Sequence, residues 1–331
     1  MAISDGTVVA QKNTKTISII VPCFNEADNL DTLIQSTIKA SDSLDSNFEI
    51  LFVNDGSVDA TPQKLNALAA QHTCIKVIHF SQNHGQSAAL QAGFDYASGD
   101  IIVTMDADLQ NDPADIPMML QELGKGYDLI FGWRQKRSDP FLSRKLPSMF
   151  ANRLIAFITS FPAHDIGCGL KAMKREVLTN LLLVGDFHRY IPILAHWQGA
   201  RCKEVIVRHH PRRNGKSKYG IDRIIKVLLD LITIKFFITY MHNPMRLFGR
   251  YGLLSLFVGV VSGFVALILK MATDFDLTGN PLSLIAIFLI IIGVQFFFLG
   301  MLGELCARIY YDRSARKMYS IREMINIDEK E

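Results

Sequence analysis

Two long runs without a charged residue constrain the fold of this chain most strongly. They cover residues 251–269 and 277–303, which are 19 and 27 residues long. A helix needs about 20 apolar residues to cross the hydrocarbon core of a bilayer. We therefore expect two transmembrane helices, over residues 247–270 and 281–306. Two buried core helices of a soluble protein are the alternative.

The charges that flank these runs predict an orientation. Arg246 and Arg250 precede the first run and basic residues follow the second, whereas the short connection carries Asp274 and Asp276. Because basic flanks stay in the cytoplasm, we expect an integral protein of the cytoplasmic (inner) membrane with both termini cytoplasmic. The polar N-terminal tail, residues 1–16, has no apolar segment typical of a secretory signal.

A basic cluster lies just before the apolar runs. Residues 201–226 are rich in lysine and arginine, against only Glu204 and Asp222, although the net charge of the whole chain is a mild +3. Such a cluster suits anionic lipid headgroups or a phosphate-bearing substrate. We do not expect nucleic acid as a partner, because no nucleic-acid-binding module surrounds the cluster.

The residues before this cluster predict an α/β domain. Apolar runs at residues 17–21, 49–53, 76–80, 100–105 and 128–131 alternate with segments of helical spacing. This alternation is typical of a parallel sheet with helices on both faces. Polar, turn-forming residues follow all five runs, and open α/β sheets bind ligands at this carboxyl edge. We expect a nucleotide-type site there.

Three later segments are less regular in sequence. We expect helical and irregular structure over residues 140–184 and a short strand over residues 203–207. Residues 221–245 carry a helical apolar stripe with charges beside it, which predicts a juxtamembrane amphipathic helix in the membrane interface. Packing of this helix against the soluble domain is the alternative.

Asp106 and Asp108 follow the fourth apolar run. Two carboxylates one residue apart on extended chain point the same way, because side chains alternate along a strand. They offer Mg²⁺ or Mn²⁺ two oxygen ligands and leave its other positions to water and substrate phosphates. A helix N-cap pair before Asp112 and Pro113 is the alternative. The pattern predicts a cation site that binds a diphosphate.

Several motifs occur in one order along the chain: Val21-Pro22 with Asn25-Glu26, Asn54-Asp55-Gly56-Ser57, Asn83 with Gly85, Asp106-Ala107-Asp108-Leu109-Gln110, Asp165-Ile166-Gly167-Cys168-Gly169, and Arg213-x-Gly215-x-Ser217-Lys218-Tyr219. In this order, followed by two membrane helices, they resemble glycosyltransferase family 2. The similarity is greatest to the membrane-anchored polyprenyl-phosphate glycosyltransferases, the group of dolichol-phosphate mannose synthase and the GtrB-type enzymes.

The resemblance implies a GT-A (Rossmann-like) catalytic domain over residues 17–220, followed by the amphipathic helix, the two transmembrane helices and a cytoplasmic tail, residues 307–331. It implies an inverting, metal-dependent transfer of a sugar from a nucleotide diphosphate to a lipid phosphate. We expect glucose from UDP-glucose as the sugar and undecaprenyl phosphate as the acceptor. GDP-mannose or a UDP-aminosugar is the alternative donor, and a non-catalytic nucleotide-sugar sensor is the alternative function.

The resemblance also implies roles for individual residues. Asp106, Asp108 and Gln110 are the implied metal ligands. The implied nucleotide-sugar site comprises Pro22, Asn25, Glu26, Asp55, Ser57, Asn83, Gly85 and Asp106. Asn54 departs from the aspartate of many relatives, although its amide can still orient a ribose or a backbone group.

Basic residues are our candidates for phosphate binding and catalysis. They are Arg134 and Arg144, with Arg213 and Lys218 of the basic loop, which follows residue 207. The polar Ser217 of the same loop is a further candidate. The resemblance implies that Asp165 is the general base. A phosphate monoester has a second pKa of about 6 and little proton to lose at cytosolic pH. We therefore expect Asp165 to orient the acceptor or the sugar hydroxyls as much as it removes a proton.

The membrane segment suggests two further partners. Gly293, Gly300 and Gly303 allow close helix packing, which favours a homo-oligomer. Two membrane helices are too few for an obvious flippase, so we expect a separate protein to move the product across the bilayer.

Overall fold

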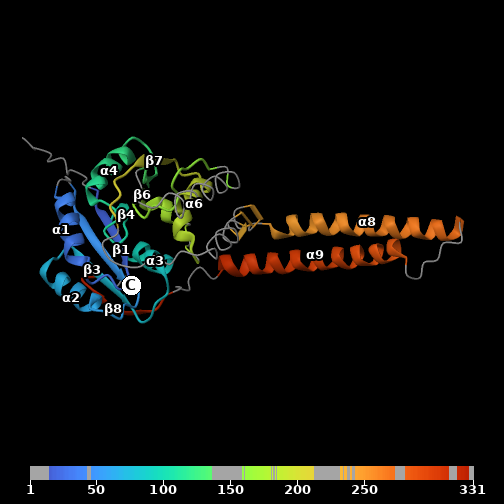
Figure 1. Cartoon of the computed structure of the whole chain (residues 1–331), viewed down its shortest axis with the longest axis horizontal. Helices are drawn as coiled ribbons and strands as arrows, with labels where there is room; N and C mark the ends of the chain where they lie inside the picture. Colours follow the sequence, from blue (N-terminus) through green and yellow to red (C-terminus); the bar gives the residue numbers. More distant parts are fainter. Residues whose placement is uncertain are drawn as a thin grey trace, which may run out of the picture. The chain divides into compact units, whose positions relative to one another are not determined.

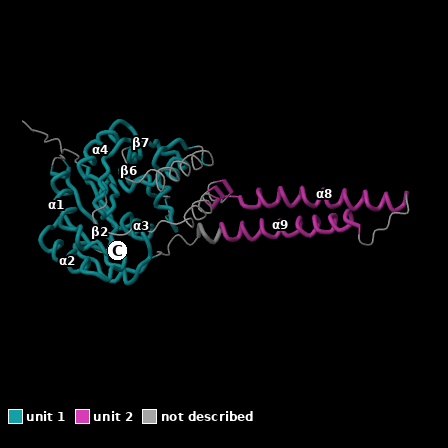
Figure 2. The backbone as a smooth tube through the Cα atoms, in the orientation of Figure 1, with its two compact units in different colours: residues 1–227, 318–331 teal, residues 228–317 magenta. Residues whose placement is uncertain are grey.

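The computed structural model describes residues 15–42, 46–135, 159, 161–179, 181, 183, 185–211, 232–233, 235–236, 239–240, 243–272, 280–312 and 319–327. The chain forms two compact units (Figure 2). The first, called the catalytic unit below, comprises residues 1–227 with 318–331, and the second comprises residues 228–317.

One sheet of eight strands forms the centre of the catalytic unit, in the order β7-β5-β6-β4-β1-β2-β3-β8 (Figure 1). The strands are β1 (Ile17–Cys23), β2 (Phe48–Asn54), β3 (Ile75–Phe80), β4 (Ile101–Thr104), β5 (Leu129–Trp133), β6 (Lys171–Lys174), β7 (Cys202–Ile206) and β8 (Ile321–Ile325). Only β6 and β8 run antiparallel to their neighbours. The carboxyl ends of β1 to β5 therefore meet at one edge, as predicted.

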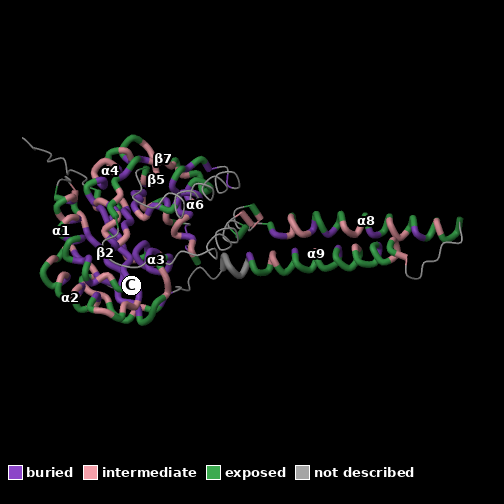
Figure 3. Tube along the Cα trace, in the orientation of Figure 1, coloured by how far each residue is buried: buried purple, intermediate pink, exposed green. Residues whose placement is uncertain are grey.

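Helices flank this sheet: α1 (Leu30–Ser41), α2 (Thr61–Gln71), α3 (Gln86–Tyr96), α4 (Ile116–Gly124) and α6 (Ile191–Trp197), with short 3₁₀ turns η1 (Pro113–Asp115), η3 (Arg175–Leu178) and η4 (Phe187–Tyr190). Side chains from both faces of β1 and β2 are fully buried, among them Ile19, Ile20, Leu51 and Phe52. Figure 3 shows this buried centre in purple. The continuous apolar runs of these strands are typical of parallel strands that are covered on both faces.

Strand β6 contradicts the expectation of helical and irregular structure over residues 140–184. It has only four residues, with lysines at both ends, so its sequence gives no apolar run. Hydrogen bonds to β4 on one side and β5 on the other hold it in the sheet. Tertiary pairing, rather than local pattern, decides this strand.

The geometry that we expected for Asp106 and Asp108 is also wrong. Strand β4 ends at Thr104, and the residues after it form a turn in which Leu109 has a φ of +59°. The two carboxylates are therefore brought together by a turn and not by the alternation of an extended strand.

The C-terminal tail is part of the fold. We expected residues 307–331 to form a cytoplasmic tail, but residues 307–312 continue a helix and residues 321–325 form edge strand β8. Strand β8 pairs with β3, so the end of the chain completes the sheet of the catalytic unit.

The second unit contains two long helices, α8 (Pro244–Ala272) and α9 (Pro281–Asp312). The segments Pro244–Ala272 and Pro281–Ala307 are long and apolar enough to cross a membrane. Only 17% and 11% of their most apolar windows are buried, whereas the core helix of a soluble protein is mostly buried. Figure 3 shows their largely exposed surfaces in green.

The three glycines on which we based self-association lie between α8 and α9. A Cβ on Gly293 would lie 2.6 Å from Cγ of Leu256, and one on Gly300 would lie 2.6 Å from Sδ of Met245. Gly303 likewise lies against Pro244. These glycines allow close packing within one chain, and the homo-oligomer stays a prediction. Most of the expected amphipathic helix, residues 221–245, lies outside the described residues.

Candidate active site

Asp106 is the centre of a polar cluster at the carboxyl edge of the sheet. Its Oδ1 accepts a hydrogen bond from Nε2 of Gln86 (2.8 Å), the first residue of α3. Burial raises the pKa of Asp106, and the charge of Asp108 raises it further, while Lys171 and Arg134 oppose this effect. These four charged groups therefore lie close enough to influence one another.

Residues 168–171 pack directly against Asp106. A Cβ on Gly169 would lie only 2.1 Å from Oδ2 of Asp106, so this position has no room for a side chain. The buried Lys171 donates from Nζ to the carbonyl of Cys168 (2.5 Å). Burial lowers the pKa of Lys171, whereas the carboxylate of Asp106 acts to raise it. The positive charge of Lys171 and the negative charge of Asp106 therefore favour each other, although burial favours the neutral form of both groups.

Asp165 and Arg134 form a bidentate ion pair. Nε of Arg134 donates to Oδ2 of Asp165 (2.7 Å), and Nη2 donates to Oδ1 (2.9 Å). The Asp165 side chain is 2% exposed and that of Arg134 is 19% exposed. Burial acts to lower the pKa of Arg134, but the hydrogen bonds and charge of Asp165 raise it on balance. The pair therefore holds a permanent cation beside Asp106.

Glu204 on β7 fixes the backbone before this ion pair. It accepts hydrogen bonds from the backbone N–H groups of His164 (2.9 Å) and Asp165 (2.8 Å), and it lies 2.7 Å from Nδ1 of His164. The His164 ring stacks on Trp133, with 4.2 Å between the ring centroids. Glu204 therefore fixes the position of Asp165 from a distant part of the sequence.

Asp55 organises the loop after β3. Its carboxylate accepts hydrogen bonds from the backbone N–H groups of His84 (2.6 Å) and Gly85 (2.9 Å), and its carbonyl accepts one from Nδ2 of Asn83 (3.2 Å). Burial raises the pKa of Asp55, and these backbone donors oppose the shift. Asp55 thus shapes the predicted nucleotide site by holding its loop.

A hydrogen bond joins Asn25, in the loop after β1, to Ser57, in the loop after β2. The backbone N–H of Asn25 donates to Oγ of Ser57 (2.9 Å), and that of Val58 donates to Oδ1 of Asn25 (2.9 Å). Glu26 is half-buried and accepts a hydrogen bond from Nδ2 of Asn29 (2.5 Å), whereas Pro22 is buried within β1. Asn25, Glu26 and Ser57 therefore line this edge, and Pro22 lies beneath it.

Asn54 orients a backbone group, which is one of the two roles that we expected of its amide. Its Nδ2 lies 2.9 Å from Nδ1 of His79, and its Oδ1 accepts from the backbone N–H of Ser57 (3.1 Å). With 2% of its surface exposed, Asn54 supports the loop after β2 from below. The aspartate of many relatives is therefore replaced here at a supporting position.

The residues that we expected to hold a cation fit one. Asp106 and Asp108 are close enough for the charge of one to raise the pKa of the other, and a divalent cation would relieve this repulsion. No group of three His, Cys, Asp or Glu side chains suited to a metal occurs in the described part of the chain. Mg²⁺ commonly uses one or two carboxylates with substrate phosphates, so two carboxylates suffice.

Gln110 connects this turn to the basic loop. Its backbone N–H donates to Oδ1 of Asp108 (3.2 Å), and its carbonyl accepts from the backbone N–H of His210 (3.0 Å). His210 comes shortly before Arg212 and Arg213, two residues of the basic cluster. The four phosphate-binding candidates Arg144, Arg213, Ser217 and Lys218 lie outside the described residues.

Sequence reasoning missed Gln86, Lys171 and Glu204. Lys171 carries a usable signal, because it is a charged residue directly between the apolar residues Leu170 and Ala172. Gln86 and Glu204 carry none, since their partners lie 20 and 39 residues away in the sequence.

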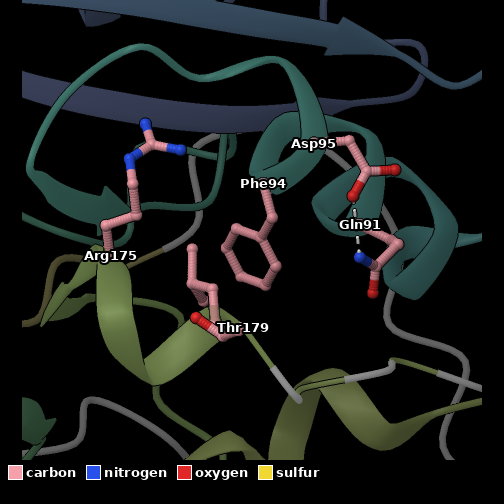
Figure 4. A pocket seen from close by; sticks show the side chains of 6 residues that line it. Gln91, Phe94, Asp95, Arg175 and Thr179 are labelled. Carbon is pink, nitrogen blue, oxygen red and sulfur yellow. Dashed lines mark hydrogen bonds between the residues drawn. The ribbon is translucent and has the colours of Figure 1, made fainter.

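A separate cavity lies away from this cluster (Figure 4). It is lined by Gln91, Phe94, Asp95, Arg175, Leu178 and Thr179. The guanidinium of Arg175 is bonded to the carbonyls of Gly99 (2.8 Å) and Ala97 (2.7 Å), just before β4 begins. This cavity therefore lies at the amino end of β4, opposite Asp106, and is not the candidate active site.

Comparison with known proteins identifies the family. Residues 18–182 match the Glycosyl transferase family 2 profile, and residues 243–309 match that of the GtrB C-terminal hairpin. The chain is 38% identical over 320 residues to a dodecaprenyl-phosphate galacturonate synthase of Rhizobium johnstonii, covering 94% of this chain and 93% of the relative. The chain belongs to glycosyltransferase family 2.

A second relative and a solved structure agree with this assignment. The glycosyltransferase is 34% identical over 313 residues to an undecaprenyl-phosphate 4-deoxy-4-formamido-L-arabinose transferase of Klebsiella pneumoniae, covering 94% of each chain. Its fold is similar to that of glucosyl-3-phosphoglycerate synthase from Mycobacterium tuberculosis, solved with Mn²⁺ and UDP-glucose. The TM-score is 0.53 at 21% identity, over 68% of this chain and 79% of that one. The GT-A fold is thus the one predicted.

Proposed function

We propose that this glycosyltransferase transfers one sugar from a nucleotide diphosphate to a polyprenyl phosphate, with inversion, at the cytoplasmic face of the inner membrane. The observation that carries the proposal is the placement of Asp106 and Asp108 beside the Asp165–Arg134 pair, on a chain with two apolar helices. The carboxylates of Asp106 and Asp108 suit a divalent metal ion that binds the diphosphate of the donor. The guanidinium of Arg134 suits a second phosphate group.

The donor occupies the edge formed by the loops after β1 to β4. In this proposal Asp106, Asp108 and Gln110 hold Mg²⁺ or Mn²⁺. When bound, the ion neutralises charge that develops on the diphosphate leaving group. Asn25, Glu26, Ser57, Asn83 and Gly85 form the nucleotide side of the site. Asp55 holds this side in shape through the N–H groups of His84 and Gly85.

Arg134 binds phosphate from a fixed position. Asp165 engages two of its N–H groups, and a guanidinium carries five N–H donors. The remaining donors suit the phosphate oxygens of either substrate, and a guanidinium stays charged throughout. Because both Asp165 oxygens accept from Arg134, we assign Asp165 to positioning this cation rather than to removing a proton.

The acceptor supplies its own nucleophile. Its phosphate is mostly dianionic at cytosolic pH, since the second pKa of a phosphate monoester is about 6. We propose that Arg144 and the loop residues Arg213, Ser217 and Lys218 bind this dianion. The bridge between Asn111 and His209 supports this proposal, because it holds residue 209, which is four residues before Arg213, close to the turn that carries Asp106 and Asp108.

For the donor we propose a UDP-hexose, with UDP-glucose as the first candidate. The relative at 38% identity favours galacturonate as a second candidate sugar, because it is a dodecaprenyl-phosphate galacturonate synthase. The two sugars differ at C6, where galacturonate has a carboxylate in place of the hydroxymethyl group, and in the configuration of the hydroxyl at C4. An enzyme site discriminates strongly between two sugars only where it pairs with a polar group that one of them lacks. Direct measurement of transfer therefore decides between the two donors.

Transfer of label into lipid tests the proposal. The detergent-purified chain is incubated with undecaprenyl phosphate, Mn²⁺ or Mg²⁺, and in turn labelled UDP-glucose, UDP-galacturonate, GDP-mannose or UDP-N-acetylglucosamine. We expect label in the organic phase from one donor, only with the metal and not with Asp108→Asn.

Two other outcomes would contradict parts of this proposal. Label that is insensitive to a chelator would remove the metal from it. Nucleotide binding without transfer from any donor would favour the non-catalytic sensor.

A further inference from the structure

The segment that follows α9 reaches the donor side of the catalytic unit. Strand β8 pairs antiparallel with β3 at the edge of the sheet, and the register shifts between His79 and Phe80. The residues just before β8, Tyr319 and Ser320, therefore lie beside the end of β3. The loop after β3, residues 81–85, is the loop that Asp55 holds.

Tyr319 anchors this segment. Its ring is 7% exposed and stacks on Phe80, with 5.2 Å between centroids. Its hydroxyl donates to Oδ2 of Asp95 (2.6 Å), one of the residues around the cavity in Figure 4. Burial and the charge of Asp95 raise the pKa of Tyr319, so the hydroxyl stays a donor. The residue before Ser320 is thus held by packing and a hydrogen bond.

Ser320 contacts the loop after β3 at two residues. Its carbonyl accepts from the backbone N–H of Ser81 (3.1 Å), and its hydroxyl contacts the Ser81 hydroxyl. Its backbone N–H donates to Nε2 of His84 (3.3 Å), and its hydroxyl lies 3.0 Å from the same nitrogen. The His84 ring also meets Phe80 edge-on, with 5.5 Å between centroids. The tail therefore fixes the His84 side chain.

The same residue is fixed from the other side by the donor site. The backbone N–H of His84 donates to Asp55 (2.6 Å), and Gln86, two residues later, donates to Asp106 (2.8 Å). Residues 84–86 therefore connect the tail to both predicted parts of the donor site, the nucleotide loop and the metal turn.

We propose that Ser320 is a positioning residue for the donor site, acting through His84. This inference rests on the proposed function of residues 55, 84–86 and 106 in binding the nucleotide diphosphate. It makes the segment that follows the second membrane helix a part of the donor site's support. Loss of the Ser320 contact then loosens residues 83–86 and weakens donor binding, while the acceptor side is unchanged.

The matched control lies at the other end of the same strand. Nδ2 of Asn326 donates to the carbonyls of Ala69 and Ile75, both at 2.9 Å. Asn326→Ala and Ser320→Ala each remove side-chain hydrogen bonding that holds β8. Only Ser320 touches the loop after β3.

The experiment measures donor KM, acceptor KM and backbone amide exchange of residues 81–86 in the full chain. We expect Ser320→Ala to raise donor KM about fivefold, the effect of one hydrogen bond, and to speed exchange of these amides similarly. Acceptor KM stays at the wild-type value, and Asn326→Ala changes none of the three. His84→Phe combined with Ser320→Ala has no larger effect than His84→Phe alone.

Equal values for Ser320→Ala and Asn326→Ala, in both donor KM and exchange, would overturn the inference. So would additive effects in the double variant. Amide exchange does not depend on catalysis, so it decides the Ser320–His84 contact even if the wild-type chain transfers no sugar. In that case the absent transfer counts against the proposed function alone.

Discussion

At the scale of single residues, the charged side chains of the candidate site interact with one another or with backbone amides. Asp165 engages Arg134, Lys171 lies behind Asp106, and Asp55 engages backbone amides. Each carboxylate that family resemblance marks as functional therefore has a structural partner. Preorganised charge of this kind acts without reorganisation during the reaction.

Replacing Asp165 tests whether it positions Arg134. In Asp165→Asn the amide offers one acceptor oxygen, so the bidentate pair is lost. We expect kcat to fall by about 100-fold, comparable to the loss of one oxyanion-hole donor, with a similar loss across neutral and alkaline pH. Arg134→Lys, which keeps the charge without the fork, is expected to show a similar loss. The readout is the pH profile of kcat for both variants, and a defect of Asp165→Asn confined to the acid limb would instead assign base catalysis.

Gly169→Ala tests the placement of Asp106. Because the new Cβ would lie 2.1 Å from Oδ2 of Asp106, this carboxylate must move. We expect a loss of at least tenfold in turnover and weaker activation by Mn²⁺, with a stability cost of about 1–3 kcal/mol. Gly124→Ala is the control, since a Cβ at Gly124 meets no atom within 4 Å. The measurements that check this prediction are the Mn²⁺ dependence of turnover and the thermal unfolding of both variants. Normal Mn²⁺ activation in Gly169→Ala would show that Asp106 is not a metal ligand.

At the scale of elements, a buried carboxylate ties together the amino ends of three strands. Glu49 on β2 accepts from Ser18 on β1, pairs with Lys76 on β3 (2.6 Å), and accepts from N and Oγ of Ser98 (both 2.7 Å). Burial alone would raise its pKa, but these partners lower it from 4.5 to about 2. This cluster lies at the edge opposite the site and stabilises the sheet.

The sign of this shift predicts how stability depends on pH. A carboxylate with a lowered pKa in the folded state stabilises the fold fully above pH 4.5, and this contribution is lost as pH falls towards about 2. At neutral pH it corresponds to about 3 kcal/mol. We expect Glu49→Gln to lose most of this stability and to flatten the acid limb of the unfolding curve.

Urea unfolding of the detergent-solubilised chain over acidic to neutral pH checks this prediction. Asp31→Asn is the control, because Asp31 is 58% exposed in its ion pair with Lys64 and contributes little. An unchanged acid limb in Glu49→Gln would assign acid unfolding to other groups.

At the scale of the whole molecule, strand β8 determines whether the tail and the catalytic unit lie on the same side of a membrane. The chain leaves the catalytic unit, contains two candidate membrane spans, and returns to the sheet that it left. If both helices cross the bilayer, the catalytic unit and the tail lie on the same side. The basic flanks predict that this side is the cytoplasm.

Fusion reporters test this orientation. Alkaline phosphatase fused after Asn280, between the two spans, is expected to be active, because it folds only outside the cytoplasm. A fluorescent protein fused after Glu331 is expected to fluoresce, because it matures in the cytoplasm. The opposite pattern would reverse the predicted orientation, and an active phosphatase after Asn280 combined with no fluorescence from the fusion after Glu331 would contradict two spans.

The sequence by itself determined the class of this protein and the location of its site. Continuous apolar runs predict buried strands and membrane helices because burial depends on composition, and turn residues after β1 to β5 mark the carboxyl edge. Aspartates 106, 108 and 165 were predicted from local motifs. Their partners were not, because Gln86, Lys171, Glu204 and Ser320 reach the site only through sheet order and loop packing. Strands β6 and β8 were missed for the same reason: hydrogen bonds between strands hold them in place, and a local pattern cannot reveal a distant partner.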